Sequence, residues 1–294
     1  MTHLSKSRLP SLLEAGLVTF LWSSSYLLVK IGLTQVSPLT LVSLRYLIAS
    51  AILLSLALAK GEIHLLKGVK NLLKLGFLGI SGYTIAQGLQ CLGLFYLPAI
   101  SVTFILNFTP VIVLILGAMF HQEKPSRLQL GGMGIVLFGA YLFFNAPLSA
   151  NSLAGTLITL LSGVGWAAYL VSSRRLFARE KVNPLGFTAF TMGLGTIAIA
   201  TAAYSVEGFP QVLPFSWAII LWLGVVNTAF AFFLWNHALQ RVEAFEISIL
   251  QNSMLIQIAM LSWLFLGEEL TGMKIFSIAL VFVGVLMVQL KGRH

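Results

Sequence analysis

Three polar side chains recur within a long apolar stretch of the chain, at a spacing typical of one helix face. Tyr83, Gln87 and Gln90 stand four and three residues apart, so a helix through them places all three on the same side. Polar groups inside a membrane are costly unless they find partners. Two amides and a phenol offer hydrogen bonds without a formal charge, which favours a small zwitterion or an amphipathic metabolite over an inorganic ion as ligand.

A second polar face occurs twice further along the chain. Thr103 and Asn107 stand four residues apart, and Ser248 and Asn252 repeat that spacing. Aromatic and hydroxyl side chains lie within two more apolar stretches. We therefore expect a cavity lined by neutral donors, acceptors and rings. The predicted substrate-binding residues are Trp22, Ser25, Tyr26, Tyr83, Gln87, Gln90, Asn107, Trp166, Tyr169 and Asn252.

The same residue types also serve structure, and both roles stay open at these positions. Buried Asn and Gln join membrane helices by hydrogen bonds. Trp22 and Trp166 lie too deep in their stretches for an interfacial belt, so they form either a cavity wall or packing contacts. Pro110 predicts a kink, because it removes one helical hydrogen bond and frees the carbonyl of Leu106.

Two basic side chains are candidate charge contacts. Lys30 lies near the outer end of its apolar stretch, where a long side chain can snorkel to the interface. Arg45 lies about two turns into the next stretch. Its candidate partners are a substrate carboxylate and the acids Glu207, Glu268 and Glu269.

Other chemistry lacks the residues that it needs. The sequence offers no His/Asp metal cluster, no acid pair and no activated Ser or Cys, so we expect neither an enzyme nor a cofactor or metal site. The single Cys91 excludes a disulfide framework and a thiolate metal site. All nine acids are Glu, and none falls in the middle third of a predicted helix. His237 is an imperfect coupling candidate, and uniport, exchange and proton antiport all remain open.

The amino-acid composition indicates that these residues lie in a membrane and not in water. Of the 294 residues, 58% are hydrophobic and 9% are charged, whereas a soluble domain has about 25% charged residues. One crossing takes roughly 20 apolar residues, and in lipid an uninterrupted apolar run must be a helix. The sequence therefore predicts an all-α, polytopic membrane protein. The net charge of +9 does not indicate nucleic acid, because membrane topology explains where the basic residues lie.

A repeat organises the chain. Adding 145 carries Ala99 to Ala244, Asn107 to Asn252, Gly79 to Gly224, Leu94 to Leu239, Gly139 to Gly284 and Glu123 to Glu268. A register held without a gap over about residues 72–144 indicates two copies of one unit. The acids Glu123 and Glu268 are expected to cap helix starts, where the helix dipole favours a negative charge.

Ten transmembrane helices follow from the apolar stretches. We expect them at about 11–33, 38–59, 71–96, 98–121, 127–144, 153–176, 184–205, 214–239, 244–266 and 271–290. They divide into a first repeat (11–144) and a second repeat (153–290). An N-terminal segment (1–10) and a tail (291–294) are expected in the cytoplasm, and a linker (145–152) outside.

Basic residues set the orientation. With the N-terminus in the cytoplasm, 15 of the 18 Lys and Arg residues fall on the inner side, as the positive-inside rule requires. The exceptions are Lys30, Arg45 and Lys274. Ten crossings then place both termini inside and make the second repeat inverted relative to the first. Inverted repeats enclose a site that can open to either side, which is a transporter architecture.

Several segments resemble the EamA branch of the drug/metabolite transporter superfamily. They are Leu21-Trp22-Ser-Ser-Ser-Tyr26…Lys30, Pro38-Leu…Leu44-Arg45-Tyr46, Trp166…Tyr169…Ser173-Arg174-Arg175, and the endings Phe120-His-Gln-Glu123 and Phe265-Leu-Gly-Glu268. The resemblance implies ten helices in two inverted five-helix repeats and, often, export of amino acids or other small metabolites. The first repeat lacks the usual Gly before Glu123.

We expect a secondary transporter that exports amino acids or related compounds across the inner or plasma membrane by alternating access. An exchanger of phosphorylated or nucleotide-linked metabolites is an alternative, which would need several buried cations. A non-transport membrane protein is a more distant one. The expected partners are a small-molecule substrate and the lipid bilayer, without nucleic acid, and both a monomer and a dimer fit the sequence.

Overall fold

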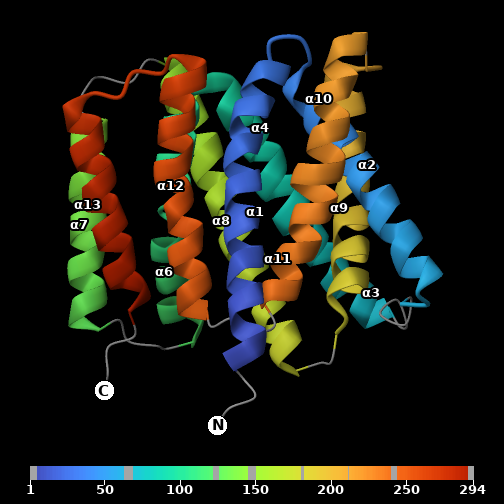
Figure 1. Ribbon diagram of the computed structural model, residues 1–294, viewed down its shortest axis with the longest axis horizontal. Helices are drawn as coiled ribbons and strands as arrows, with labels where there is room; N and C mark the ends of the chain where they lie inside the picture. Colours follow the sequence, from blue (N-terminus) through green and yellow to red (C-terminus); the bar gives the residue numbers. More distant parts are fainter. Residues whose placement is uncertain are drawn as a thin grey trace.

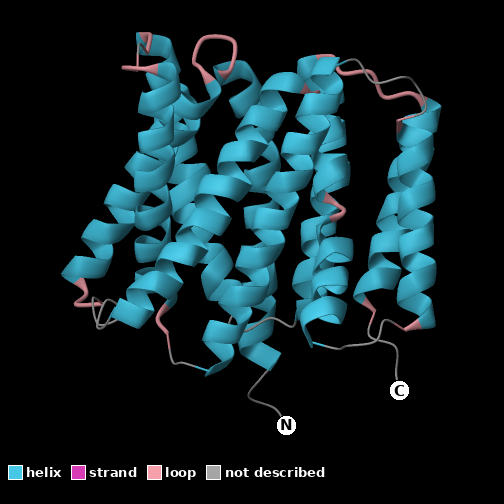
Figure 2. Cartoon of the chain, turned by 180° about the vertical axis from the view of Figure 1, so that it is seen from behind, coloured by secondary structure: helices cyan, strands magenta, loops and turns pink. Residues whose placement is uncertain are grey.

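The computed structural model describes residues 5–62, 69–121, 126–144, 150–179, 182–210, 212–239 and 244–290, and over these residues the chain is helical without a strand. The helices lie side by side in one bundle, with connections at its two ends (Figure 1, Figure 2). Helix α1 begins and helix α13 ends at the same end of this bundle (Figure 1).

The first part of the chain contains α1 (Ser5–Gly32), α2 (Pro38–Ala59), α3 (Val69–Gly79), the π-helical segment η2 (Ile80–Gly88), α4 (Leu89–Tyr96), α5 (Ala99–Leu106), α6 (Thr109–His121) and α7 (Arg127–Phe143). The second part contains α8 (Ala150–Arg179), α9 (Pro184–Glu207), α10 (Pro214–Gly224), the π-helical segment η3 (Val225–Phe230), α11 (Ala231–Leu239), α12 (Ala244–Leu266) and α13 (Gly272–Gln289). Segments α3, η2 and α4 follow one another directly, and so do α10, η3 and α11.

Local sequence explains where these helices begin. Pro38, Pro184 and Pro214 each open a helix, where the missing N–H costs nothing. At the start of α7, the hydroxyl of Ser126 accepts the backbone N–H of Gln129, whose side chain accepts the N–H of Ser126 in return. This capping box satisfies two amide donors that a helix start leaves open.

The stretch expected as one helix over 98–121 is interrupted. Helix α5 ends at Leu106 and α6 begins at Thr109, so the break lies just before Pro110 rather than as a kink within one helix. Proline cannot donate to the carbonyl four residues earlier. The hydroxyl of Thr109 donates to that carbonyl, on Leu106, at 2.7 Å.

The outer surface of the bundle is apolar. Among the described residues, six helices are long and apolar enough to cross a membrane, and three shorter apolar helices accompany them. Large side chains such as Leu73, Tyr141 and Val206 are mostly exposed, which suits lipid and not water. The protein is an integral, multi-pass membrane protein.

Glycines let the helices approach closely. Helices α7 and α13 form a pair at one edge of the bundle (Figure 1). A Cβ placed on Gly132 would lie 2.7 Å from the carbonyl oxygen of Gly284, and one on Gly284 would lie 2.9 Å from that of Gly132. Small residues at such crossings allow backbone contact between membrane helices.

Corresponding helices of the two halves make corresponding contacts. Helix α1 contacts α12, as α8 contacts α5 and α6, and α2 packs against α9. The α3–η2–α4 segment contacts α8 and α9, while the α10–η3–α11 segment contacts α1 and α2. The π-helical segments begin at Ile80 and Val225, which stand at the repeat offset of 145 seen in the sequence. Helices α1 and α8 run in opposite directions (Figure 1).

Candidate functional site

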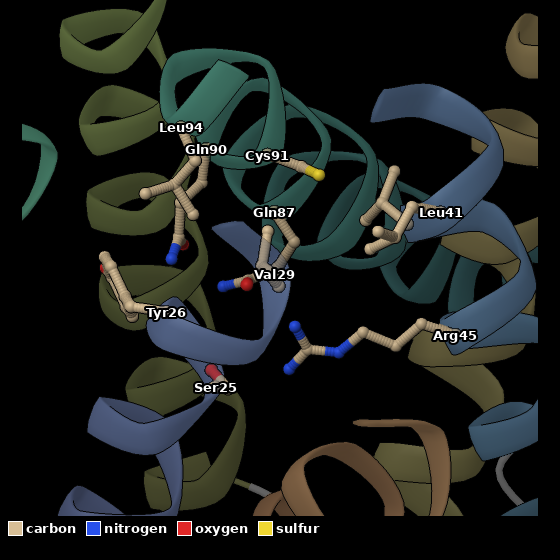
Figure 3. A pocket seen from close by; sticks show the side chains of 10 residues that line it. Ser25, Tyr26, Val29, Leu41, Arg45, Gln87, Gln90, Cys91 and Leu94 are labelled. Carbon is tan, nitrogen blue, oxygen red and sulfur yellow. The ribbon is translucent and has the colours of Figure 1, made fainter. Parts of the chain in front are cut away.

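A polar pocket lies between α1, α2 and the η2–α4 segment. Ten residues line it, and Figure 3 shows their side chains converging from these elements: Ser25, Tyr26 and Val29 from α1, Leu41, Val42 and Arg45 from α2, and Gln87, Gln90, Cys91 and Leu94 from η2 and α4. In each element the lining includes residues three or four positions apart, such as Tyr26 and Val29 or Leu41 and Arg45, which lie on one helix face. Five sequence-predicted residues, together with Cys91, thus meet at one place.

The guanidinium of Arg45 is hydrogen-bonded on one edge, and its other edge faces the pocket. Its Nε–H donates to Oγ1 of Thr228 at 2.5 Å, and Nη2 lies 3.5 Å from the carbonyl oxygen of Asn227. The side chain is only 7% exposed. Figure 3 shows the guanidinium end projecting into the pocket toward Gln87 and Ser25. Over the described part of the chain, Arg45 makes no ion pair with a carboxylate.

The π-helical segments supply part of this arrangement. Gln87 belongs to η2, while Asn227 and Thr228 belong to η3. The hydroxyl of Thr228 also donates to the carbonyl of Leu223, five residues earlier, at 2.7 Å. A π-helical turn leaves backbone groups available for other partners and is frequent at functional sites. Here η3 presents a carbonyl and a hydroxyl to the guanidinium of Arg45.

The remaining polar groups are neutral. Gln87 and Gln90 are half-buried, and their amides project into the pocket (Figure 3). The hydroxyl of Tyr26 interacts with the side chains of Gln90 and Thr103. Ser25 donates to the carbonyl of Trp22 at 2.7 Å. The pocket therefore combines one cation with amides and hydroxyls that can donate or accept.

The pocket is narrow in this conformation. Its cavity volume is about 10 Å³. That is roughly the room that one water molecule needs. A metabolite would require the surrounding helices to separate.

Four of the predicted aromatic residues, Trp22, Tyr83, Trp166 and Tyr169, form a cluster of their own. The rings of Trp22 and Trp166 lie 6.4 Å apart, and Trp166 stacks on Tyr169 at 5.2 Å. The hydroxyls of Tyr83 and Tyr169 are 3.3 Å apart. Phe232 of α11 contacts the rings of Trp22, Tyr83 and Trp166. These rings pack against one another and are not among the residues that line the pocket.

Several buried donors in this region lack partners over the described residues. They include the indole N–H groups of Trp22 and Trp235, whose rings lie 4.9 Å apart, and the hydroxyl of Tyr46. The ring centres of Tyr46 and Tyr83 lie 5.7 Å apart. Buried donors are nearly always matched by protein or water, so this region can accept a polar ligand or water in another conformation.

The two asparagines of the repeated polar face lie elsewhere. Asn107 donates its amide to the carbonyl of Thr103, one turn earlier, at 2.9 Å. Asn252 donates to Oε1 of Gln289 at 3.0 Å, which links α12 to α13. Neither residue lines the pocket.

The other charged residues singled out in the sequence have partners of their own. Lys30 donates to the carbonyls of Leu94 and Leu97 at 2.9 and 3.0 Å, at the end of α4. The carboxylate of Glu207 accepts the N–H of Leu39 and of Thr40, at the start of α2. These groups therefore stabilise helix ends.

Glu268 caps a helix start, as expected, but not the start of the helix that follows it. Its carboxylate accepts the N–H of Ala99 at 2.6 Å and of Ile100 at 3.0 Å, at the start of α5. Thr271 caps α13 instead. Glu123, its counterpart in the repeat, lies outside the described residues. Glu207 and Glu268 therefore do not pair with Arg45, contrary to one of the alternatives.

Sequence reasoning missed Asn227 and Thr228 as partners of Arg45. The repeat offered a signal, because Thr228 stands 145 residues after Tyr83. The apolar lining, formed by Val29, Leu41, Val42 and Leu94, was also missed. Apolar side chains are too common in this chain to be singled out by type.

The comparisons with known proteins agree with this architecture. The model of the EamA-like transporter family matches twice, over residues 10–145 and 153–290. The chain belongs to this family. It is thereby a member of the drug/metabolite transporter superfamily and a transporter, not an enzyme.

Curated relatives of this EamA-like transporter cover most of its length. An uncharacterized transporter of Archaeoglobus fulgidus is 27% identical over 243 residues, which span 80% of this chain and 81% of the relative. A probable amino-acid metabolite efflux pump of Salmonella typhimurium is 24% identical over 288 residues, 92% of each chain. One crystal structure matches with a TM-score of 0.70 at 19% identity and covers 95% of this chain and 97% of the other, which shows the shared fold.

Proposed function

We propose that this EamA-like transporter is a secondary transporter that exports amino acids or related small metabolites across the inner or plasma membrane by alternating access. The observation that carries the proposal is the pocket at Arg45. It is buried among apolar helices and lined by a guanidinium, two amides and two hydroxyls. Such a lining matches a small molecule with a carboxylate and further polar groups.

The architecture that we propose is ten transmembrane helices in two inverted five-helix repeats, 11–144 and 153–290. The recurring contacts between the halves support it, as do the two π-helical segments at the repeat offset. The two-repeat architecture is also supported by two acids at the repeat offset, each of which bonds near a helix start. Glu207 binds the start of α2, and Glu62, 145 residues earlier, accepts a hydrogen bond at 2.7 Å from Asn183, which caps α9.

The orientation that we propose has both termini in the cytoplasm. It rests on the distribution of Lys and Arg. The common end of the bundle at which α1 begins and α13 ends is consistent with it (Figure 1). The pocket then lies between the two membrane faces, where inverted repeats place a substrate site.

The pocket favours amino acids over phosphorylated substrates. Phosphate recognition commonly uses several cations, and Arg45 is the charged residue among the described residues that line this pocket. The Salmonella typhimurium and Escherichia coli relatives named probable amino-acid metabolite efflux pumps, at 24% and 23% identity, support the same substrate class.

Efflux from proteoliposomes tests the proposal. Vesicles that contain the purified chain are loaded with the common amino acids, and mass spectrometry follows each compound outside. We expect at least one amino acid to leave faster than from protein-free vesicles. Equal leakage of every amino acid from both preparations, with the protein folded and inserted, contradicts the proposed function.

A further inference from the structure

Arg45 carries a buried charge that no carboxylate of the described residues pairs with, although its guanidinium carbon lies 5.4 Å from the centre of the Tyr46 ring. Its side chain is 7% exposed, and its hydrogen bonds go to a neutral hydroxyl and, at 3.5 Å, to a backbone carbonyl. A buried charge is normally paired or bound by a counter-ion. The acids Glu207 and Glu268, which the sequence offered as partners, accept hydrogen bonds at helix starts.

Contacts with the η3 segment orient the guanidinium of Arg45. The bond from Nε to Thr228 fixes one edge of the planar group. The terminal nitrogens then extend into the pocket (Figure 3). A guanidinium held in this way offers parallel N–H groups, which match the two oxygens of a carboxylate.

The rest of the lining complements a carboxylate-bearing molecule. The amide N–H groups of Gln87 and Gln90 can donate to a carboxylate, and their carbonyl oxygens can accept from an ammonium group. Val29, Leu41 and Leu94 supply apolar surface beside them. The described lining contains no acid that would hold an amine by charge.

We propose that this pocket is a carboxylate subsite, in which Arg45 binds the carboxylate of a small organic acid or amino acid and Gln87 and Gln90 bind its remaining polar groups. This inference rests on the proposed function and names the chemical group that the transporter recognises. The carboxylate is the required feature, and the ammonium group of an amino acid is accommodated by neutral acceptors.

A matched set of compounds separates these features. The melting temperature Tm of the purified full chain is measured with 4-methylpentanoate, L-leucine, L-leucinamide and 3-methylbutylamine. A ligand that binds only the folded state raises Tm. We expect the two carboxylates to raise Tm and the amide and the amine to leave it unchanged.

Variants assign the effect to the pocket. Arg45→Gln should lower carboxylate affinity about tenfold or more, because hydrogen bonds to a charged group are lost. Lys60→Gln removes the same charge at the exposed end of α2 and should keep the wild-type response. Gln87→Glu places a carboxylate of the chain itself beside the guanidinium. It should raise Tm without ligand and abolish the response to carboxylates.

The outcomes are distinct. If L-leucinamide raises Tm as much as L-leucine, if no carboxylate raises it, or if Arg45→Gln responds normally, the carboxylate subsite is wrong. Should Arg45→Gln fail to fold, a full wild-type response in Gln87→Glu overturns the proposal by itself. Efflux from proteoliposomes decides the transport function separately, since export can persist through a site that does not use Arg45.

Discussion

At the scale of single residues, the position of a polar group in the fold separates two roles that its type leaves open. Gln90 projects into the pocket and interacts with Tyr26. Asn252, also an amide in an apolar helix, is satisfied by Gln289. The first amide remains free to change partners with a ligand, whereas the second joins two helices.

We predict opposite effects for the removal of these two amides. Gln90→Leu should lower the affinity for a transported amino acid about tenfold or more and change Tm little, because a bond to a charged ligand group contributes about 1.5–3 kcal/mol. Asn252→Leu should lower Tm and keep the affinity, because an interhelix hydrogen bond contributes about 0.6 kcal/mol. Ligand binding and thermal unfolding of the same purified variants measure both effects. Reduced affinity in Asn252→Leu with unchanged Tm would contradict this assignment.

Spacing and residue type in the sequence predicted part of the pocket lining, but not all of it. Gln87, Gln90, Ser25, Tyr26 and Arg45 line it, and their roles in binding stay predictions. The repeated Thr-Asn face was equally regular in sequence. Periodicity shows which residues share a face, but the neighbouring helix decides whether that face meets a pocket, a partner amide or its own backbone.

At the scale of elements, close backbone contact sets the position of η2 and its glutamine. A Cβ on Gly79, at the end of α3, would lie 2.5 Å from the carbonyl oxygen of Thr191 and 2.9 Å from the backbone N of Gly195 in α9. A Cβ on Gly76, about one turn earlier, would have no other atom within 4 Å. The contact between α3 and α9 therefore depends on Gly79.

Alanine at these two positions should separate helix propensity from helix packing. We predict that Gly79→Ala destabilises the protein by about 1–3 kcal/mol, as overpacking does. Gly76→Ala should leave stability unchanged or raise it by up to about 1 kcal/mol, since alanine favours a helix. Thermal unfolding of both variants gives the comparison. Equal stability of the two would show that α3 and α9 do not touch at Gly79.

The sequence predicted which regions are helical better than it predicted where the helices begin or where they become π-helical. The apolar stretches marked the regions that the structure makes helical, but α1 begins at Ser5 instead of near residue 11. A polar first turn carries no hydrophobic signal, so its helicity cannot be recognised from apolar length. The π-helical segments at Ile80 and Val225 were also not predicted. Their side chains bond to distant helices, as Thr84 does to the carbonyl of Gly195, and a local apolar pattern does not show such partners.

At the scale of the whole molecule, the repeat relates parts that lie far apart in sequence. Gly79 packs against the carbonyl of Thr191, and its counterpart Gly224 packs against that of Arg45. Such matched contacts are expected of two copies of one unit. If the copies are inverted, corresponding loops of the two repeats face opposite sides of the membrane, which cysteine labelling can measure.

We predict that residues 60–70 and 177–181 face the cytoplasm and that residues 145–152 face outside. Parts of these segments lie outside the described residues. Single cysteines introduced there on a Cys91→Ser background are treated with a membrane-impermeant thiol reagent in intact cells. Only the cysteine in 145–152 should react, and lysis should expose the others. External labelling of both basic segments would rule out the inverted arrangement.

The most direct test of alternating access uses the chain's own cysteine. Cys91 is the single cysteine, and it lines the pocket beside Arg45. The anionic, impermeant reagent 2-sulfonatoethyl methanethiosulfonate is applied to right-side-out and to inside-out vesicles, and mass spectrometry follows modification of Cys91. One pocket that opens in turn to each face predicts slow modification from both sides, slowed further by a transported amino acid. Modification from one side only, with and without the amino acid, would contradict alternating access through this pocket.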